Sequence, residues 1–486
     1  MFLRFLTLIT GVVLRAIAPR LTMLSLLALS SAAMSAQADN LDLGAIEDHI
    51  TRTLERDRVP GAAVAIVRRT DVLFLRGFGN DGQGRPVQKD TGFVIGSMSK
   101  AFTALTAMRL IEAGRVALDT PIVPTLPELE NADSVAWQNI TLGHLLTHTS
   151  GVPTRTPDMP PDTSLAQHVE ALSDVELNGT HAARHAYSSA NYILAARMLE
   201  MVSGTPFDLL LADQVLAPLG IVRGDRPLTE RRPRGHQYWF VWPRSTDRPA
   251  EIGRLATSAM TASVADMARF LQFQLGDGTW NGQSLLSAAG LAEMHKGTAQ
   301  GDGFSYGLGW RNVDIVGVRK VQHGGVVPDF RGKMILLPDH DAAVVVLTNA
   351  SSVLPLPIRP TSHRLANEIA IHLAGGPLRL PNLGYRTWLI LIWSALGIMV
   401  MHQFVTLARV ALGRDPARHP LRSAAIDTAM VLGILFVLPW GLGLSLRALV
   451  DQTPDLALWL ATMSLLAICV TAIRAVQARS TGSRQA

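Results

Sequence analysis

Between residues 40 and 375, short apolar runs typical of strands alternate with stretches whose apolar positions recur every three or four residues, as in helices. The helical pattern is present at 44–58, from Ser97 to a stop signal at Gly114, and at 191–203, 264–275 and 363–374. The strand pattern is present at 61–67, 72–79, 316–322, 334–337 and 342–348. Because strands lie at both ends with helices between them, we predict an α+β domain whose antiparallel sheet is closed by distant parts of the chain.

A second hydrophobic pattern follows a linker at 377–387. Three apolar runs, at 388–408, 424–446 and 456–473, each approach the roughly 20 residues that a transmembrane helix needs. Buried core helices would be the other interpretation, but three runs in series with arginine-rich ends favour membrane spans.

The charges around these runs predict their orientation. Arg409, Arg414, Arg418 and Arg422 lie between the first two runs, and three more arginines lie in the tail, 474–486. Positively charged loops stay in the cytoplasm, so the first span runs inward. We therefore expect a multi-pass protein of the inner membrane, with residues 39–376 in the periplasm.

Residues 1–38 resemble an export signal. An apolar run of small residues, 21–33, follows three arginines, and Ala36-Gln37-Ala38 matches an A-x-A cleavage site. An uncleaved anchor is the alternative, and either interpretation sends the following domain across a membrane.

Composition adds a few limits. The net charge of +5 comes with no basic stripe interleaved with aromatics, so we expect no nucleic-acid partner. The single cysteine, Cys469, excludes an intramolecular disulfide. Residues 222–254 hold eight arginines, four acids and four aromatics, which suits a solvated loop, a rim over an active site, or a surface on anionic lipid.

Candidate chemistry begins at Ser97 and Lys100, which share one helix face because they are three residues apart. A serine hydroxyl needs an adjacent base to act as a nucleophile, and a lysine of lowered pKa can supply one. The pattern arises readily by chance, although this chain has only five lysines.

Two further segments offer partners. Tyr187 precedes a helix, and a phenol near a lysine ammonium can shuttle protons, although such a tyrosine is more often a packing residue. His323-Gly324-Gly325 follows a predicted strand, where glycines let a substrate backbone approach and an N–H could complete an oxyanion hole with the N–H of Ser97. A solvated loop is the alternative there.

These segments together resemble a known family. Ser97-Met-Ser-Lys100, Leu145-Leu-Thr-His-Thr-Ser-Gly151, Tyr187-Ser-Ser189 and His323-Gly-Gly325 occur in the order found in serine penicillin-recognising hydrolases, and more narrowly in the class C β-lactamase-like group. The resemblance covers about residues 40–375. It implies the β-lactamase/transpeptidase-like fold, with an antiparallel sheet flanked by helices and a helical subdomain, and it implies no cofactor.

The resemblance also implies roles for the residues. Ser97 would be the acylated nucleophile, Lys100 its proton acceptor and Tyr187 the group that protonates the leaving group. The N–H groups of Ser97 and Val326 would form the oxyanion hole. Substrate-binding positions would be Ser189, His323, Gly324, Gly325, Thr257 and Ser258.

Three positions refine this assignment. The third position of the tyrosine motif is commonly Asn and is Ser189 here, which puts ordinary β-lactam recognition in doubt and leaves room for a polar substrate side chain. His144 and His148 have metal-pair spacing, but no His-Glu-x-x-His accompanies them, so we assign them structural roles and predict no metal site.

The architecture narrows the resemblance to the membrane-bound prodrug-activating peptidases of nonribosomal peptide pathways, such as the colibactin-maturing peptidase. It implies removal of an N-acyl-D-amino acid cap, with D-Asn the expected residue, from an acylated peptide-like precursor that partitions into membrane lipid. A homodimer is left open. The alternatives are a DD-carboxypeptidase, D-aminopeptidase, esterase or weak β-lactamase, and a non-hydrolysing β-lactam receptor.

Overall fold

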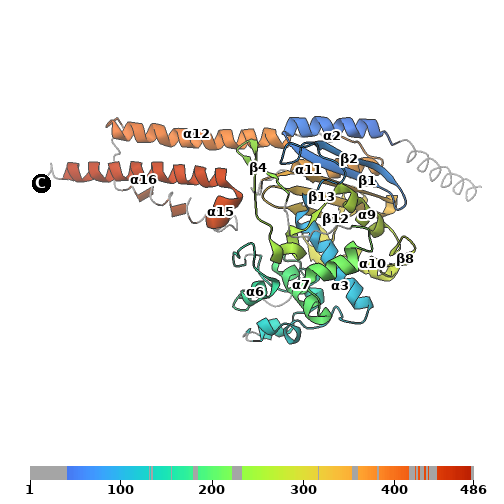
Figure 1. Ribbon diagram of the computed structural model, residues 1–486. Helices are drawn as coiled ribbons and strands as arrows, with labels where there is room; N and C mark the ends of the chain where they lie inside the picture. The colour runs from blue at the N-terminus through green and yellow to red at the C-terminus, as the bar shows by residue number, and fades with distance from the viewer. Residues whose placement is uncertain are drawn as a thin grey trace, which may run out of the picture.

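Eight strands form an antiparallel sheet at the centre of the structure (Figure 1). The computed structural model describes residues 41–482 except 131, 133–134, 155, 179–183, 222–232, 316, 353–358, 380–382 and most of 415–445. The spatial order is β2, β1, β14, β13, β12, β11, β10, β9, so distant parts of the chain meet at the centre of the sheet. The bounds are β1 Gly61–Val67, β2 Val72–Gly79, β9 Ala299–Gly301, β10 Phe304–Tyr306, β11 Arg311–Ile315, β12 Val318–Val326, β13 Arg331–Leu337 and β14 Ala342–Thr348.

Strand β1 explains why the sheet is covered on both faces. All seven of its residues are buried, and successive side chains point to opposite faces. One set, which includes Ala63 and Ala65, packs in the core that contains α3 (Ser99–Glu112) and α9 (Val264–Leu275). The other set, which includes Val64 and Ile66, packs against α2 (Leu43–Asp57) and α11 (Thr361–Leu373). The continuous apolar run of β1 is therefore the signature of a strand between two helical layers.

The helices of the larger core lie below the sheet in Figure 1, on the side opposite α2. They form a helical subdomain around α3 and α7, and their bounds are α4 Val135–Gln138, α5 Leu142–Leu146, α6 Leu165–Glu170, α7 Ala190–Ser203, α8 Phe207–Leu211 and α10 Ala288–His295. Short strands form three smaller sheets. In the first, β3 (Phe93–Val94) pairs with the distant β6 (Thr261–Ala262); in the second, β7 (Thr279–Trp280) pairs with the adjacent β8 (Gln283–Ser284); and in the third, β4 (His236–Trp239) pairs with the adjacent β5 (Trp242–Ser245) and the distant β15 (Ala350–Ser351). The predicted α+β class is confirmed.

A buried polar network ties α2 to α11 on the face of the sheet opposite α3 and α9. The Arg364 guanidinium donates to the Asp57 carboxylate at 2.9 Å, and His49 pairs with Glu368 at 2.8 Å. The Asp57 side chain is fully buried, so its charge is stable there only because these partners satisfy it. The network fixes both helices on the same face of the sheet.

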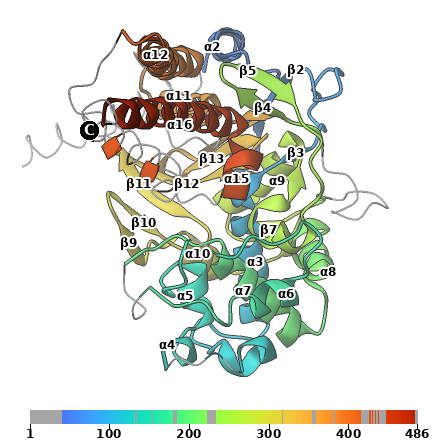
Figure 2. The ribbon, with the colours of Figure 1, turned by 90° about the vertical axis from the view of Figure 1, so that its left-hand side faces the viewer.

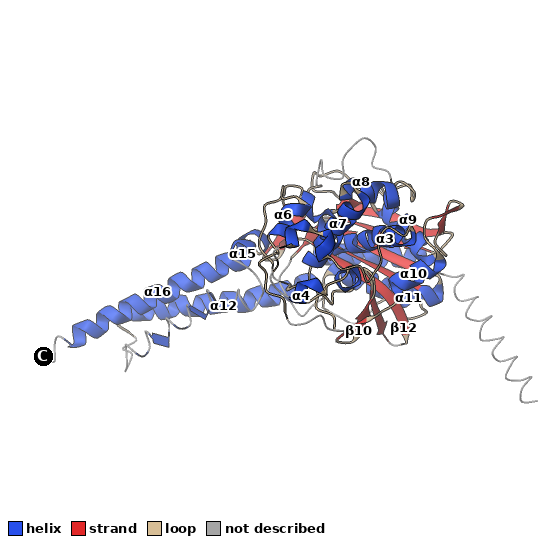
Figure 3. Cartoon of the chain, turned by 90° about the horizontal axis from the view of Figure 1, so that it is seen from below, coloured by secondary structure: helices blue, strands red, loops and turns tan. Residues whose placement is uncertain are grey.

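Two long apolar helices leave the domain side by side, as Figures 1 and 3 show. They are α12 (Tyr385–Ala411) and α16 (Pro454–Gly482), and the short helix α15 (Leu446–Gln452) lies at the domain end of α16. Trp459 of α16 donates its indole N–H to the carbonyl of Leu396 on α12 at 3.0 Å. Much of their apolar surface is open, and Ile398 is 70% exposed.

By length and composition, the stretches Tyr385–Ala411 and Pro454–Gln477 are candidate membrane spans. At 27 residues, α12 is about 40 Å long, more than the roughly 30 Å of a bilayer core. The fold therefore shows two candidate spans among the described residues where the sequence predicts three. Most of the predicted span 424–446 lies outside the described residues, and all of the predicted signal segment 1–38 does.

Candidate active site

Ser97 is brought to the edge of the sheet by a glycine with a left-handed backbone. Gly96 has φ +59°, and a Cβ there would lie 2.5 Å from the Val326 nitrogen. Residues Gly96–Met98 form a 3₁₀ turn before α3. The helix predicted from Ser97 therefore has a first turn that is wound more tightly than the α-helix that follows. Only a residue without Cβ allows this turn to contact the end of β12. The backbones of Ser97 and Val326 thereby come together from opposite elements, as an oxyanion hole would require.

Lys100 is fully buried, one helical turn from Ser97. Its Nζ donates to Ser97 Oγ at 3.3 Å, to Ser189 Oγ at 3.3 Å and to the Thr257 carbonyl at 3.0 Å. Three acceptors from three different segments therefore fix the ammonium beside the hydroxyl. The spacing predicts the first contact, and the tertiary fold supplies the other two.

Tyr187 reaches the same hydroxyl from a loop 90 residues away. Its OH donates to Ser97 Oγ at 2.8 Å, and its ring lies 5.0 Å from Lys100 Nζ. Burial alone would raise the pKa of Tyr187, but the Lys100 charge and hydrogen bonds from Lys100, Ser97 and Ser189 outweigh it and lower that pKa. The phenolate is therefore more accessible at neutral pH than in free tyrosine.

His148 holds the tyrosine loop in place. This residue has φ +58°, and its carbonyl accepts from the Ala186 N–H at 2.8 Å. Its Nδ1 accepts from the Ser188 N–H at 3.3 Å and faces the Asn191 amide at 3.2 Å. Burial and the Lys100 charge lower the pKa of His148 well below its ordinary value, so the ring stays neutral. His148 thus positions Tyr187, while His144 contacts Thr141 at the start of α5.

His323 lies on β12, opposite Tyr187 across the site. Its Nδ1 faces the Gly324 carbonyl at 2.8 Å, so that nitrogen carries the proton, and its Nε2 accepts from the Tyr306 OH at 2.9 Å. Burial and the Lys100 charge lower the pKa of His323 to about 3. The His-Gly-Gly strand therefore adds no positive charge to the site.

Positive charge comes instead from the next strands. Arg311 on β11 and Lys333 on β13 line a cavity of about 430 Å³ that also contains Ser97, Tyr187 and His323. Burial and the charges of Arg359, Lys320 and Arg311 lower the pKa of Lys333 to about 7. Neither residue is among the sequence-predicted positions, although Lys333 is one of only five lysines.

A second cavity, of about 660 Å³, opens on the other side of Ser97. Ser97 and Val326 line both cavities, so the nucleophile lies at the junction of two lobes. Ser189 and Ser258 line only the second lobe. An amide held across Ser97 could therefore direct its acyl half into one lobe and its leaving group into the other.

The other predicted substrate-binding residues have mixed placements. Gly324 lines the first lobe, whereas Gly325 packs under Gly96, where a Cβ would lie 1.8 Å from the Ile95 carbonyl oxygen. Thr257 is buried, lines neither lobe and donates its hydroxyl to the Arg254 carbonyl at 3.1 Å. The Thr257 backbone carbonyl, which accepts from Lys100 Nζ, therefore helps to position the Lys100 ammonium.

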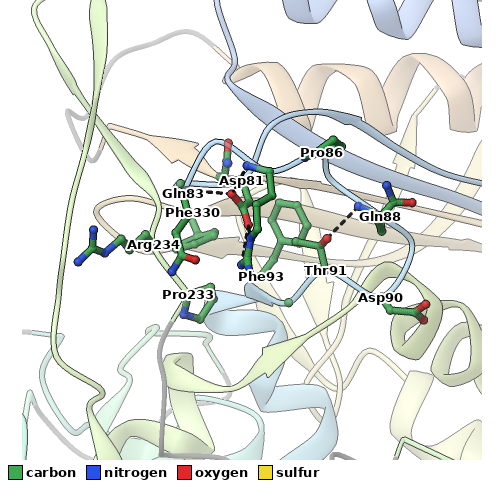
Figure 4. Close-up of a pocket in the computed structure, with 14 residues that line it drawn as sticks. Asp81, Gln83, Pro86, Gln88, Asp90, Thr91, Phe93, Pro233, Arg234 and Phe330 are labelled. Carbon is green, nitrogen blue, oxygen red and sulfur yellow. Dashed lines mark hydrogen bonds and ion pairs between the residues drawn. The ribbon is translucent and has the colours of Figure 1, made fainter.

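A third cavity, of about 650 Å³, lies near β3 and contains none of the candidate catalytic residues (Figure 4). Its Asp81 carboxylate accepts from the backbone N–H groups of Gln83 and Arg85 at 2.8 and 2.9 Å. These bonds stabilise a turn and lower the pKa of Asp81 despite partial burial. Asp81 is therefore explained by local structure.

No group of three or more His, Cys, Asp or Glu side chains suited to a metal ion occurs within the described part of the chain. The geometry around Ser97 relies on a hydroxyl, an amine and a phenol. These groups can perform acyl transfer by nucleophilic attack and proton shuttling.

Comparison with known proteins identifies the family. Residues 46–367 match the family model described as Beta-lactamase. The chain belongs to the β-lactamase family. A curated relative, penicillin-binding protein 4 of Amycolatopsis lactamdurans, is 31% identical over 319 residues, which cover 60% of this chain and 81% of the relative. The family consists of serine hydrolases, so the coarse part of the predicted function is confirmed.

Solved structures show the same fold. The octameric penicillin-binding protein homologue from Pyrococcus abyssi is similar with a TM-score of 0.61 and 24% identity, covering 70% of this chain and 78% of that one. A D-stereospecific amidohydrolase from Streptomyces sp. is similar with a TM-score of 0.53 and 24% identity, covering 64% of this chain and 94% of that one. The narrower resemblance to prodrug-activating peptidases stays a prediction.

Proposed function

We propose that this protein is a membrane-anchored, periplasmic serine peptidase that removes an N-acyl-D-amino acid cap, with D-Asn the expected residue, through an acyl-enzyme. The observation that carries the proposal is the convergence on Ser97 Oγ of the Tyr187 OH at 2.8 Å and Lys100 Nζ at 3.3 Å. A hydroxyl with two proton-transfer partners at the floor of a cavity is suited to nucleophilic catalysis.

The first half of the reaction forms the acyl-enzyme. Ser97 Oγ attacks the carbonyl carbon of the amide. The sequence predicts Lys100 as the acceptor of the Ser97 proton, but Lys100 Nζ donates to three oxygens, so we assign the proton instead to the Tyr187 phenolate, whose charge the Lys100 ammonium stabilises. The N–H groups of Ser97 and Val326 stabilise the oxyanion. When the C–N bond breaks, the proton on Tyr187 goes to the leaving nitrogen. An ester between Ser97 and the acyl half remains.

The second half is hydrolysis. Tyr187 is again a phenolate and takes a proton from water, whose oxygen attacks the ester carbonyl. The C–O bond to Ser97 breaks, and the proton returns to Ser97 Oγ. No other reactant is needed.

The proposed asparagine rests on the hydroxyls near Ser97, and the proposed D-configuration rests on a structural similarity. Ser189 and Ser258 offer hydroxyls along the second lobe, which suits a polar side chain such as a carboxamide. The fold similarity to a D-stereospecific amidohydrolase supports a D-residue on the acyl side. The two candidate spans support membrane anchoring, which would concentrate the enzyme where an acylated substrate partitions.

The test compares substrates and variants of the full chain in detergent micelles. We expect hydrolysis of N-acetyl-D-asparaginyl p-nitroanilide, much slower hydrolysis of the L-isomer, and loss of turnover in both Ser97→Ala and Lys100→Ala while the thermal unfolding midpoint stays within a few degrees. Turnover that survives Ser97→Ala would exclude the mechanism.

A DD-carboxypeptidase or weak β-lactamase is the second candidate, favoured by the 31% identity to a penicillin-binding protein. It predicts faster cleavage of an acyl-D-Ala-D-Ala peptide or nitrocefin than of the D-asparaginyl substrate. A long-lived acyl-enzyme with β-lactams and no turnover of any amide would favour a non-hydrolysing receptor.

A further inference from the structure

The second lobe is walled partly by the membrane-proximal end of the chain. Its lining includes Ser97, Ser189 and Ser258 of the domain and also Arg447, Ala448, Asp451 and Gln452 of α15. We call this lobe the α15 groove. In Figure 2, α15 lies next to the end of α16, in front of the domain. A segment outside the family-matched residues 46–367 therefore contributes to the cavity that contains the nucleophile.

Backbone contacts hold α15 against the domain. The Gln237 side-chain amide donates to the carbonyls of Asp451 and Gln452 at 3.3 and 2.5 Å, and Arg248 donates to the Asp451 carbonyl. Just beyond α15, the Phe240 N–H donates to the Asp455 carboxylate at 2.9 Å. Because the contacts to α15 use its carbonyl oxygens, docking of this helix leaves the Arg447 and Asp451 side chains to the groove.

The chemistry of the groove suits a polar chain. Arg447 and Asp451 are four residues apart on one face of α15, so they offer a donor and an acceptor side by side. The domain side of the groove carries internally paired charges: Arg254 with Glu251 at 3.3 Å, and Asp247 with Arg234 at 2.5 Å. A bare hydrocarbon would leave such groups desolvated, whereas amide or hydroxyl groups can hydrogen-bond to them.

We propose that α15 forms the far wall of the acyl-side subsite, where Arg447 and Asp451 determine specificity. The substrate class is an acyl donor whose acyl half carries amide or hydroxyl groups beyond the residue attacked by Ser97. This inference rests on the proposed acyl transfer at Ser97. It also gives α16 a role beside the groove, because Asp455 at its start accepts from the Phe240 N–H of the domain.

The kinetic test uses two probes, N-acetyl-D-asparaginyl p-nitroanilide and its extended form, N-acetyl-Gly-Gly-D-asparaginyl p-nitroanilide. Arg447→Gln and Asp451→Asn in the full chain should each raise KM for the extended probe about five- to tenfold, as expected for loss of a charged hydrogen bond made equally in ground and transition states. Both kinetic constants for the short probe should stay unchanged. The matched control is Arg319→Gln, because Arg319 pairs with Asp339 and lines neither lobe.

A binding test separates this inference from catalysis. In a chain with Ser97→Ala and Cys469→Ser, a cysteine introduced by Ala448→Cys should react with a membrane-impermeant maleimide. Saturating N-acetyl-Gly-Gly-D-asparagine amide should slow that reaction at least fivefold, and N-acetyl-D-asparagine amide should not. A cysteine introduced by Arg319→Cys should be unaffected.

The outcomes are distinguishable. If the extended amide protects the cysteine at position 448 from the maleimide but the unmodified chain turns over no substrate, the proposed peptidase is excluded and the proposed binding role of the α15 groove stands. Normal turnover with no protection, and with unchanged KM in both α15 variants, would overturn the groove. A KM effect confined to an N-tetradecanoyl-D-asparaginyl probe would also overturn it, because that acyl half has no hydrogen-bonding group beyond its amide.

Discussion

The close approach of Gly96 to β12 can be tested by adding one methyl group. In Gly96→Ala, the new Cβ would lie 2.5 Å from the Val326 nitrogen and 2.9 Å from two backbone atoms of Gly325. Ordinary carbon contacts are about 3.5–4.0 Å, so β12 must retreat by roughly 1 Å. Alanine at φ +59° adds a backbone cost of about 1–2 kcal/mol.

The functional consequence follows from the same displacement. Moving the Val326 N–H by roughly 1 Å would misplace one oxyanion donor, and loss of such a donor costs about 10²–10³ in kcat. We therefore expect Gly96→Ala to lower kcat for N-acetyl-D-asparaginyl p-nitroanilide at least 100-fold. The assay pairs initial rates with thermal unfolding of the same sample.

Gly204 provides the matched control. It has φ +71° at the end of α7, and a Cβ there would meet no atom within 4 Å. Gly204→Ala should carry a similar backbone cost while kcat stays within about twofold. If Gly96→Ala kept more than a third of the activity, the contact between Gly96 and Val326 would not determine the oxyanion geometry, and the reasoning would be wrong.

Three further predictions address the Tyr187 phenol, the half-buried Lys333 of the first lobe and the buried ion pair of Asp57 with Arg364. Tyr187→Phe should lower kcat about 10²–10⁴-fold without loss of folding, checked by kinetics and circular dichroism; near-normal rates would remove Tyr187 from proton transfer. Because burial lowers the pKa of Lys333 to about 7, the folded state is penalised most below pH 7, and the penalty fades as pH rises towards 10.5. Lys333→Met should thus raise the urea midpoint more at pH 6 than at pH 9, and an equal gain would contradict the pKa shift. Asp57→Asn should cost about 3–5 kcal/mol in unfolding free energy because the buried Arg364 loses its 2.9 Å charged partner and keeps only the longer, 3.5 Å contact with Glu368, whereas Asp48→Asn, in an exposed pair, should cost under about 1 kcal/mol; similar costs would refute this assignment.

The two lobes around Ser97 suggest how substrate direction is set. The first lobe contains Arg311 and Lys333 and the second contains the α15 groove, so the two halves of a substrate meet different chemistry. The neutral His323 strand leaves positive charge to β11 and β13. Electrostatic selection in the first lobe therefore depends on strands that carry none of the recognised motifs.

The sequence by itself determined the features that depend on near neighbours. The apolar run 61–67 forms the buried strand β1. The three-residue spacing of Ser97 and Lys100 places their side chains in contact at 3.3 Å. The α+β class followed from the order of such runs. These predictions succeed because strand and helix periodicity are local properties of the chain.

Only the tertiary structure determined which distant groups contact Ser97 and Lys100. Tyr187 reaches Ser97 across 90 positions, and the Thr257 carbonyl reaches Lys100 across 157. Lys333 enters the cavity because β13 pairs with β12 in a register that sets it opposite Gly324. The carbonyls of α15 accept from the side chains of Gln237 and Arg248, and Arg248 lies 203 positions from its acceptor Asp451. Such contacts depend on strand register and on which distant segments the fold brings together, so the local periodicity of the chain does not encode them.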